Sequence, residues 1–156
     1  MMSHKCLFGL LAVLFCAHAV VGVTIISKSE WGGAAATSKT SLASSLQYAV
    51  IHHTAGAYCA TKALCVQQMK NIQHYHQASL GWADIGYNFL IGGDGNIYEG
   101  RGWNVLGAHA TNWNSKSIGI SFMGNYNTDV PTTAQINAAK NLLAAAVSRG
   151  QLVAGY

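Results

Sequence analysis

Residues 87–99, Tyr-Asn-Phe-Leu-Ile-Gly-Gly-Asp-Gly-Asn-Ile-Tyr-Glu, decide the fold of this 156-residue chain. Two β-prone runs, 87–92 and 96–99, flank the turn Gly93-Asp94-Gly95. Gly and Asp tolerate the positive φ angles of tight hairpin turns, so the stretch predicts two antiparallel strands. The rest of the chain is expected to build on this pair.

Two further strands are predicted around the hairpin. The β-prone run 48–53 is interpreted as a buried strand that ends at a site, and it follows a loop-like stretch, 34–45. Residues 117–124 alternate small or polar with apolar side chains, a pattern that predicts a strand with one face in the core.

Two helices complete the pattern. Apolar residues at helical spacing predict an amphipathic helix over 62–79, which Gly81 stops. Thr132 and Gln135 form a capping box just after a proline, and the helix that they start is expected to end at 149–150. Helices and strands alternate, so we predict an α/β fold with helices around one sheet.

Composition narrows the class of protein. The chain is 51% hydrophobic and 9% charged, which excludes a disordered or coiled-coil protein, and its length suits one domain. The net charge of +4 is spread without a basic run, so nucleic acid is a weak candidate for a partner.

The N-terminus has the pattern of a secretory signal peptide. Lys5 precedes the apolar run 7–17, and small residues at 17–19 or 20–22 offer cleavage sites. A membrane anchor is the alternative, but the run is shorter than the roughly 20 residues that a spanning helix needs. We therefore expect a signal peptide over 1–22 and a secreted, extracellular domain over 23–156 with no membrane association.

Cys59 and Cys65 are the two cysteines of that domain. In a secreted protein an even pair favours a disulfide. A zinc site that includes His52 is the alternative, although the spacing lacks the Cys-x-x-Cys pattern of common structural sites.

His52 and His53 are the sharpest candidates for chemistry. Neighbouring side chains of a strand point to opposite faces, so two separate roles are expected, and the alternative is two ordinary hydrogen-bonded polar residues. The sequence lacks the motifs His-Glu-x-x-His, Cys-x-x-Cys and Gly-x-Ser-x-Gly. It contains only three Asp and two Glu, so few carboxylates are available for the paired-carboxylate site of a glycosidase. Abundant Trp, Tyr and Asn after residue 81 suit an uncharged ligand rich in amides and hydroxyls, a glycan, a peptide or both.

Read together and in order, six blocks resemble a known family. They are Ser-Glu-Trp-Gly at 29–32, Tyr-Ala-Val-Ile-His-His-Thr-Ala at 48–55, Gly-Trp-Ala-Asp-Ile-Gly-Tyr-Asn-Phe-Leu-Ile-Gly at 81–92, Tyr-Glu-Gly-Arg-Gly-Trp at 98–103, Gly-Ala-His-Ala at 107–110 and Ser-Ile-Gly-Ile at 117–120. They closely resemble the peptidoglycan recognition proteins, which share the phage-type zinc amidase fold, and most of all the short secreted SC type of insects. The resemblance implies a central mixed β-sheet flanked by helices, with a groove for muropeptides.

The resemblance also implies an activity and roles for residues. The family hydrolyses the amide between N-acetylmuramic acid and L-alanine with Zn²⁺ held by two His and one Cys, and degrades or scavenges peptidoglycan in innate immunity. By position, His52 matches the first zinc ligand, Tyr87 matches the catalytic tyrosine, and Cys59 and Cys65 match a short disulfide. The residues that match substrate-binding positions are His53, His76, Gly81, Trp82, His109, Ala110 and Asn114. The Gly-Trp pair implies stems with meso-diaminopimelic acid, and the expected partner of this monomer is bacterial peptidoglycan.

The sequence departs from the family pattern at the remaining zinc ligands. In the family the second His and the Cys follow the final helix, whereas His109 is the last histidine here. We therefore expect a C-terminally truncated amidase fragment that is inactive as it stands. The alternative is a non-catalytic peptidoglycan-binding protein.

Overall fold

The computed structural model describes residues 22–156. The predicted signal peptide, apart from Gly22, lies outside the described residues. Within the described range, none of the helices is both long and apolar enough to cross a membrane.

A five-stranded mixed sheet forms the centre of the fold. Its strands are β1 (Ile25–Ile26), β2 (Tyr48–His53), β3 (Phe89–Ile91), β4 (Ile97–Glu99) and β5 (Ser117–Phe122), in the order β1-β4-β3-β5-β2. The predicted hairpin is confirmed, since β3 and β4 pair antiparallel, while the other neighbours pair parallel. The expected central mixed sheet is thus confirmed.

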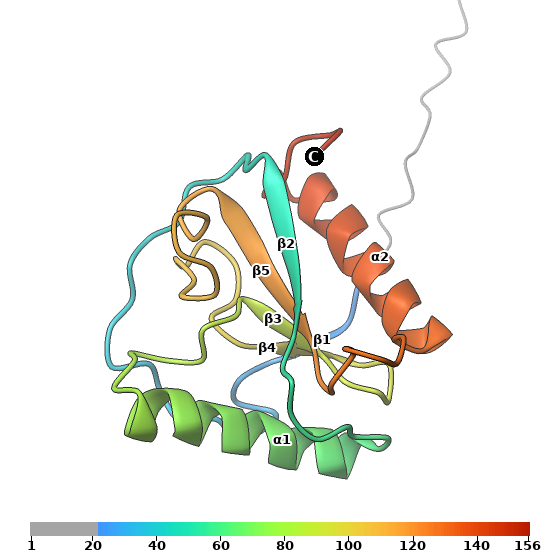
Figure 1. Cartoon of the computed structure of the whole chain (residues 1–156). Coiled ribbons are helices and arrows are strands. Elements are labelled where there is room, and N and C mark those ends of the chain that lie inside the picture. Colours follow the sequence, from blue (N-terminus) through green and yellow to red (C-terminus); the bar gives the residue numbers. More distant parts are fainter. Residues whose placement is uncertain (1–21) are drawn as a thin grey trace, which may run out of the picture.

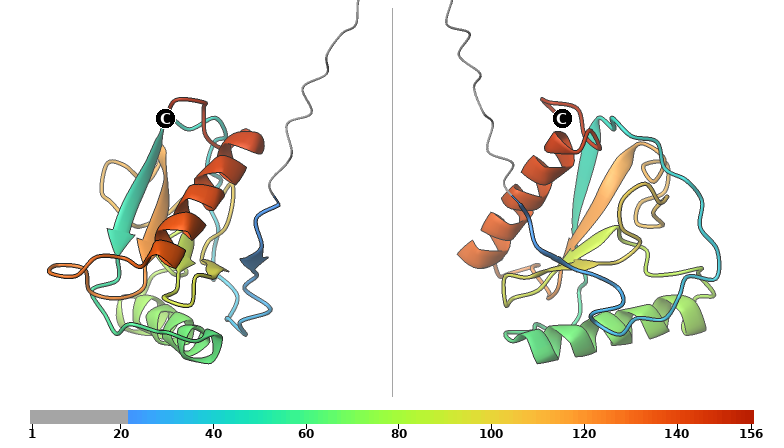
Figure 2. Two further views of the ribbon diagram at one scale, coloured as in Figure 1. Left: turned by 90° about the vertical axis from the view of Figure 1, so that its right-hand side faces the viewer. Right: turned by 180° about the vertical axis from the view of Figure 1, so that it is seen from behind.

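Two helices flank the sheet, as expected. Helix α1 (Lys62–His74) continues into a π-helical segment, η1 (Tyr75–Ser79), and α2 (Thr133–Ser148) begins with the predicted capping box. Figure 1 shows α2 alongside the strands and α1 crossing below the carboxyl end of β2, and Figure 2 shows the two helices on separate sides. The two faces of the sheet therefore receive different helices.

Two expectations about strand burial were wrong. Strand β2 is the edge of the sheet and is partly exposed, with Ile51 47% accessible, because β5 covers only one of its sides. Strand β5 is buried on both faces and not on one, because it lies between β3 and β2 and both sheet faces are covered. The small residues of β5 leave room for a loop: a Cβ atom on Gly119 would lie 2.3 Å from the His109 ring.

Each face of the sheet has its own core. On the α2 face a cluster of buried aliphatic and aromatic side chains includes Ile118, Ile120, Phe122 and Leu142, and α2 also buries the polar side chain of Gln135. On the α1 face, Met69 packs with Leu90 and Tyr98. Buried polar side chains accompany this second core: Gln73, His76, Asp84, Asn88, Ser117 and Ser121.

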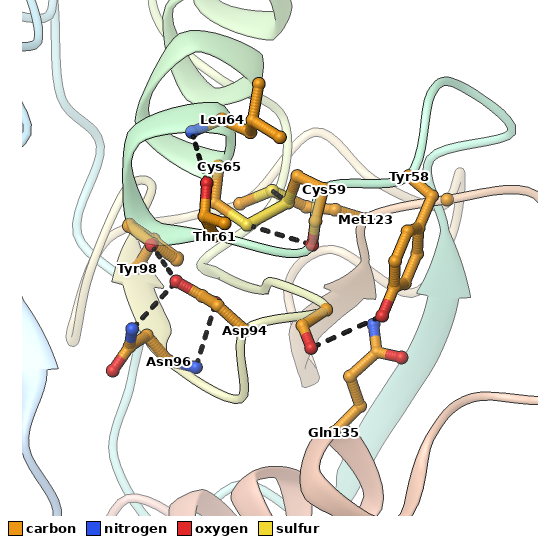
Figure 3. The surroundings of a disulfide bond; sticks show 12 residues. Tyr58, Cys59, Thr61, Leu64, Cys65, Asp94, Asn96, Tyr98, Met123 and Gln135 are labelled. Atoms are coloured by element: carbon orange, nitrogen blue, oxygen red, sulfur yellow. Dashed lines mark hydrogen bonds between the residues drawn. A yellow bond between two sulfur atoms is a disulfide. The ribbon is translucent and has the colours of Figure 1, made fainter.

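The Cys59–Cys65 disulfide is present and fixes the start of α1 (Figure 3). Both cysteines are buried, and the Thr61 side chain between them accepts a hydrogen bond from the Leu64 amide as the N-cap of the helix. A loop this short contributes about 2 kcal/mol in the chain-entropy view. The crosslink thus holds the helix entry beside the hairpin turn.

Candidate functional site

Four aromatic side chains from different elements form a row on the α1 face. His52 is the second-last residue of β2, His76 lies in η1, Tyr87 precedes β3, and His109 lies in the loop before β5. Ring centroids are 5.1 Å apart for His109 and His52, 5.4 Å for His52 and Tyr87, and 6.0 Å for Tyr87 and His76. The structure therefore brings together four of the residues singled out in the sequence.

His52 and His109 are joined by a hydrogen bond. The Nε2 atom of His52 lies 3.0 Å from the Nδ1 atom of His109, so one ring donates and the other accepts. Burial lowers the pKa of His52, with the neighbouring His53 adding to the effect, and burial together with His52 lowers the pKa of His109 to about 4. At neutral pH the pair is therefore uncharged.

Tyr87 lies between His52 and His76 in the row. Its side chain is buried enough to raise the pKa of the phenol, and the Ser121 hydroxyl on β5 opposes this effect. Strand register places Ser121 directly beside His52. The phenol is thus a neutral hydrogen-bond donor at physiological pH.

His76 has a fixed orientation. It is 8% exposed, its Nδ1 atom accepts a hydrogen bond of 3.0 Å from the Gly86 amide, and its ring lies 4.7 Å from that of Trp82. Burial lowers the pKa of His76, Arg101 lowers it further, and Asp84 raises it. Because Nδ1 accepts, the neutral ring carries its proton on Nε2.

Two open hollows flank the row and make it a groove. The first is lined by residues of α1, of η1, of the loop after β2 and of the segment before β3: Thr54, Gly56, Gln68, Asn71, Ile72, Tyr75, His76 and Tyr87. The second is lined by Trp82, Ala108, His109, Ala110, Thr111 and Asn114. We refer to both hollows and the row between them as the groove.

Asn114 shapes one wall of the groove. Its side-chain oxygen accepts hydrogen bonds from the amides of His109, at 2.8 Å, and Ala110, at 2.9 Å. These bonds hold the loop that presents His109 to His52. Asn114 and Ala110 therefore both line the second hollow of the groove.

The structure does not bring His53 into the groove. Its Nδ1 atom accepts a hydrogen bond of 2.8 Å from the Tyr126 amide, and its register partner Phe122 belongs to the core on the α2 face. The opposite directions of His52 and His53 follow from the alternation along β2. Gly81 lies at the end of η1 with φ of +70°, where it places Trp82 over His76.

Sequence reasoning missed the residues that hold the groove from below. Asn88 donates from Nδ2 to the carbonyls of Gly102 and Val105 and accepts from the Gly119 amide, so its amide is part of the framework. Asp84 is 2% exposed although it is charged. A single carboxylate in an apolar and glycine-rich stretch was the signal that could have identified it.

A zinc ion does not fit the donor set of the described residues. A catalytic zinc site takes three protein ligands. Across residues 22–156, no three side chains from His, Cys, Asp and Glu gather closely enough to hold a metal, and His109 occupies one ring nitrogen of His52. Cys59 and Cys65 are bonded to each other, so the zinc alternative for these cysteines was wrong.

Comparison with protein families gives a match over most of the domain. The family described as N-acetylmuramoyl-L-alanine amidase matches residues 42–155. Peptidoglycan-recognition protein SC2 of Drosophila simulans is 78% identical over 155 residues, which cover 99% of this chain and 84% of that protein. Peptidoglycan-recognition protein SC1a of Drosophila melanogaster is 59% identical over 94% of this chain and 80% of its own length.

Solved structures agree with these relatives. Wild-type Drosophila PGRP-LB superimposes with a TM-score of 0.83 at 41% identity, over 86% of this chain and 80% of that one. A mutant of Drosophila PGRP-LB in complex with tracheal cytotoxin gives a TM-score of 0.83 at 41% identity, over 85% and 79%. The tracheal cytotoxin complex of the PGRP-LCa and PGRP-LCx ectodomains gives 0.84 at 40% identity, over 86% and 81%.

Proposed function

The chain belongs to the peptidoglycan-recognition protein family, within the N-acetylmuramoyl-L-alanine amidase fold, and from this premise we propose that it binds muropeptides in the groove. The ligand would be the stem peptide with its attached muramic acid from bacterial peptidoglycan.

The observation that carries this proposal is the row of uncharged polar rings. The pKa values of His52, His76 and His109 are lowered and that of Tyr87 is raised, so the groove offers neutral donors and acceptors. Neutral hydrogen-bonding groups suit the amides and hydroxyls of a glycopeptide, and they leave buried polar atoms unpaired when such a ligand is absent.

The relatives support the class of ligand. Two of the similar structures contain tracheal cytotoxin, bound to PGRP-LB in one and to the LCa and LCx ectodomains in the other. Gly81 and Trp82 lie at one end of the groove, where the Trp82 ring packs against His76 at a tilt. From this pair we propose a preference for stems with meso-diaminopimelic acid over stems with lysine.

This proposal is tested by calorimetric titration of the chain with two muramyl tripeptides, one with meso-diaminopimelic acid in its stem and one with lysine. We expect saturable binding of both, tighter for the diaminopimelic acid form, and a loss of about tenfold in affinity for Y87F, because the variant lacks the phenolic donor. Lys140 is exposed on α2, so K140A is the matched control and should bind like the parent. Absence of binding by a folded parent chain would contradict the proposal.

Hydrolysis of the bond between N-acetylmuramic acid and L-alanine is the second candidate function. The family name and the 5.4 Å separation of His52 and Tyr87 favour it. In a complete zinc site His52 would be one ligand, and the metal would activate a water molecule. The donor set of residues 22–156 does not fit the ion, so we derive no catalytic step through it.

An activity assay separates binding from hydrolysis. We expect the 156-residue chain to release no stem peptides from purified peptidoglycan, with or without added Zn²⁺. Release of stem peptides would refute this expectation and favour an amidase. Coding sequence downstream of Tyr156 gives a second test, since a His and a Cys encoded there would support the amidase.

We also propose that the protein is secreted and acts outside the cell in innate immunity. The pattern of residues 1–22 supports this proposal. N-terminal sequencing of protein recovered from the culture medium should find a start between residues 20 and 23. Recovery of uncleaved chain from the cytosol would contradict it.

A further inference from the structure

The turn that connects η1 to β3, residues 80–88, carries much of the groove without regular secondary structure. It contributes the Trp82 ring, which packs against His76, and the Gly86 amide, which donates to the same imidazole. It also contributes Tyr87. A segment that lacks helix or strand bonding needs other anchors to hold three groups in place.

Asp84 supplies these anchors from inside the protein. Its Oδ1 atom accepts from the Ile85 amide at 2.8 Å and from Gln73 Nε2 at 3.2 Å, and its Oδ2 atom accepts from Lys28 Nζ. A buried carboxylate is unfavourable unless hydrogen bonds satisfy both oxygens, and here both are satisfied. Asp84 therefore has a fixed position, and so does the backbone that follows it.

The same helix face holds the turn at two points. Gln73 and His76 lie three residues apart and so share a face of the helix. Gln73 bonds to Asp84 at the first point, and His76 accepts from the Gly86 amide at the second. Gln73 also bonds to both backbone polar groups of Ala34, at 2.8 and 2.9 Å, which ties the N-terminal segment to the helix.

We propose that Asp84 is a positioning residue for the groove and that Lys28, in the N-terminal segment, is the cation that holds Asp84 in place. Lys28 is 56 residues away in sequence, and its own amide is held by Glu99 Oε2 at 2.8 Å. The ion pair sets the position of Gly86 and through it the orientation and tautomer of the His76 ring. For its effect on ligand affinity, the inference rests on the muropeptide binding proposed above.

The variant K28M tests the ion pair, since methionine is an unbranched side chain only one heavy atom shorter than lysine and carries no charge. It leaves the Asp84 carboxylate buried without its cation, so the turn should move toward water. We expect the affinity for the muramyl tripeptide with meso-diaminopimelic acid to fall about tenfold. Calorimetry measures this affinity at a temperature where circular dichroism shows a folded chain. In the double variant K28M/D84N the uncompensated charge is gone and an amide oxygen still faces the Ile85 amide, so affinity should return to within about threefold of the parent.

Nitrogen NMR of the His76 ring gives a readout that needs no ligand. The parent should show the Nε2-protonated tautomer that the Gly86 bond selects, and K28M should show a mixture of the two tautomers. This measurement keeps the two proposals apart: if the parent binds no muropeptide, the ring signal still decides whether Lys28 and Asp84 position His76. Should K28M fail to fold, D84A, which removes both carboxylate oxygens that hold the turn, takes its place.

A destabilised control separates positioning from general stability. T132A removes the N-cap of α2 and should lower the melting temperature while affinity and the His76 signal stay unchanged. Two results would overturn the proposal: K28M or D84A with the affinity and ring signal of the parent, or T132A with losses as large as those of K28M.

Discussion

The two faces of the sheet use their buried space differently. On the α2 face, β5 presents Ile118, Ile120 and Phe122 to an almost wholly apolar core. On the α1 face the same strand presents Ser117, Gly119 and Ser121, and the buried polar side chains of that face include His76, Asp84 and Asn88. Apolar contacts tolerate small shifts, whereas hydrogen bonds fix direction. The α2 face therefore supplies stability, and the α1 face supplies geometry.

The largest expected effect is on the α2 face. Leu142 is 0% exposed in the core of that face, so L142A should lower the free energy of unfolding by about 2 to 5 kcal/mol, as truncation of a buried leucine usually does. Urea denaturation measures this loss. Muropeptide affinity of the fraction that remains folded should not change, and a parallel loss of affinity would show that the two faces are not separable.

On the α1 face we expect the reverse. N114A removes the oxygen that holds the His109 and Ala110 amides, so muropeptide binding should weaken by about 1 to 3 kcal/mol with little change in unfolding free energy. Calorimetry and urea denaturation of the same variant check both parts. Equal losses of binding and stability would instead make Asn114 a core residue.

The smallest expected effect is a pH dependence on the α1 face. Because burial lowers the pKa of His76 in the folded protein, the unfolded chain takes up a proton first as the pH falls below about 6.5. Stability should therefore be full above that pH and decline as the pH drops toward the folded-state pKa. Protonation at Nδ1 would also break the bond from Gly86.

Melting temperatures at pH 7.5 and pH 5 measure this decline. H76Q, which does not titrate in this range, should show a smaller decline than the parent, whereas K140A should match the parent. The other groups that face His76 are Arg101, Asp84, Trp82, Tyr75 and Tyr87. An H76Q decline as large as that of the parent would assign the pH dependence to other groups.

Local patterns predicted much of the fold. The Gly-Asp-Gly hairpin, the Thr132–Gln135 capping box and the 62–79 helix depend on neighbouring residues, and all are present. The two-residue β1 carries too little pattern to detect. The edge position of β2 and the double burial of β5 follow from strand order, which depends on contacts between distant segments.

The candidate site likewise has features that the sequence could predict and features that depend on contacts between distant segments. His52 and Tyr87 were identified through ordered sequence blocks, and the structure places them 5.4 Å apart. The pairing of His52 with His109 spans 57 residues, and that of Lys28 with Asp84 spans 56. Neither pairing can be detected from the spacing of neighbouring residues in the sequence. Alternation along β2 does predict that His52 and His53 face apart, and this part of the interpretation agrees with the structure.

Gly119 has no functional group, yet the lack of a side chain at this position leaves the space that the His109 ring occupies. Any side chain there would collide with the His109 ring, which its bond to His52 and its loop hold in place. A single base change from glycine to alanine in the middle of a buried strand would thus separate the two imidazoles. Among natural sequences of this family, we expect such small substitutions in a buried strand to abolish the groove as readily as replacement of the histidines.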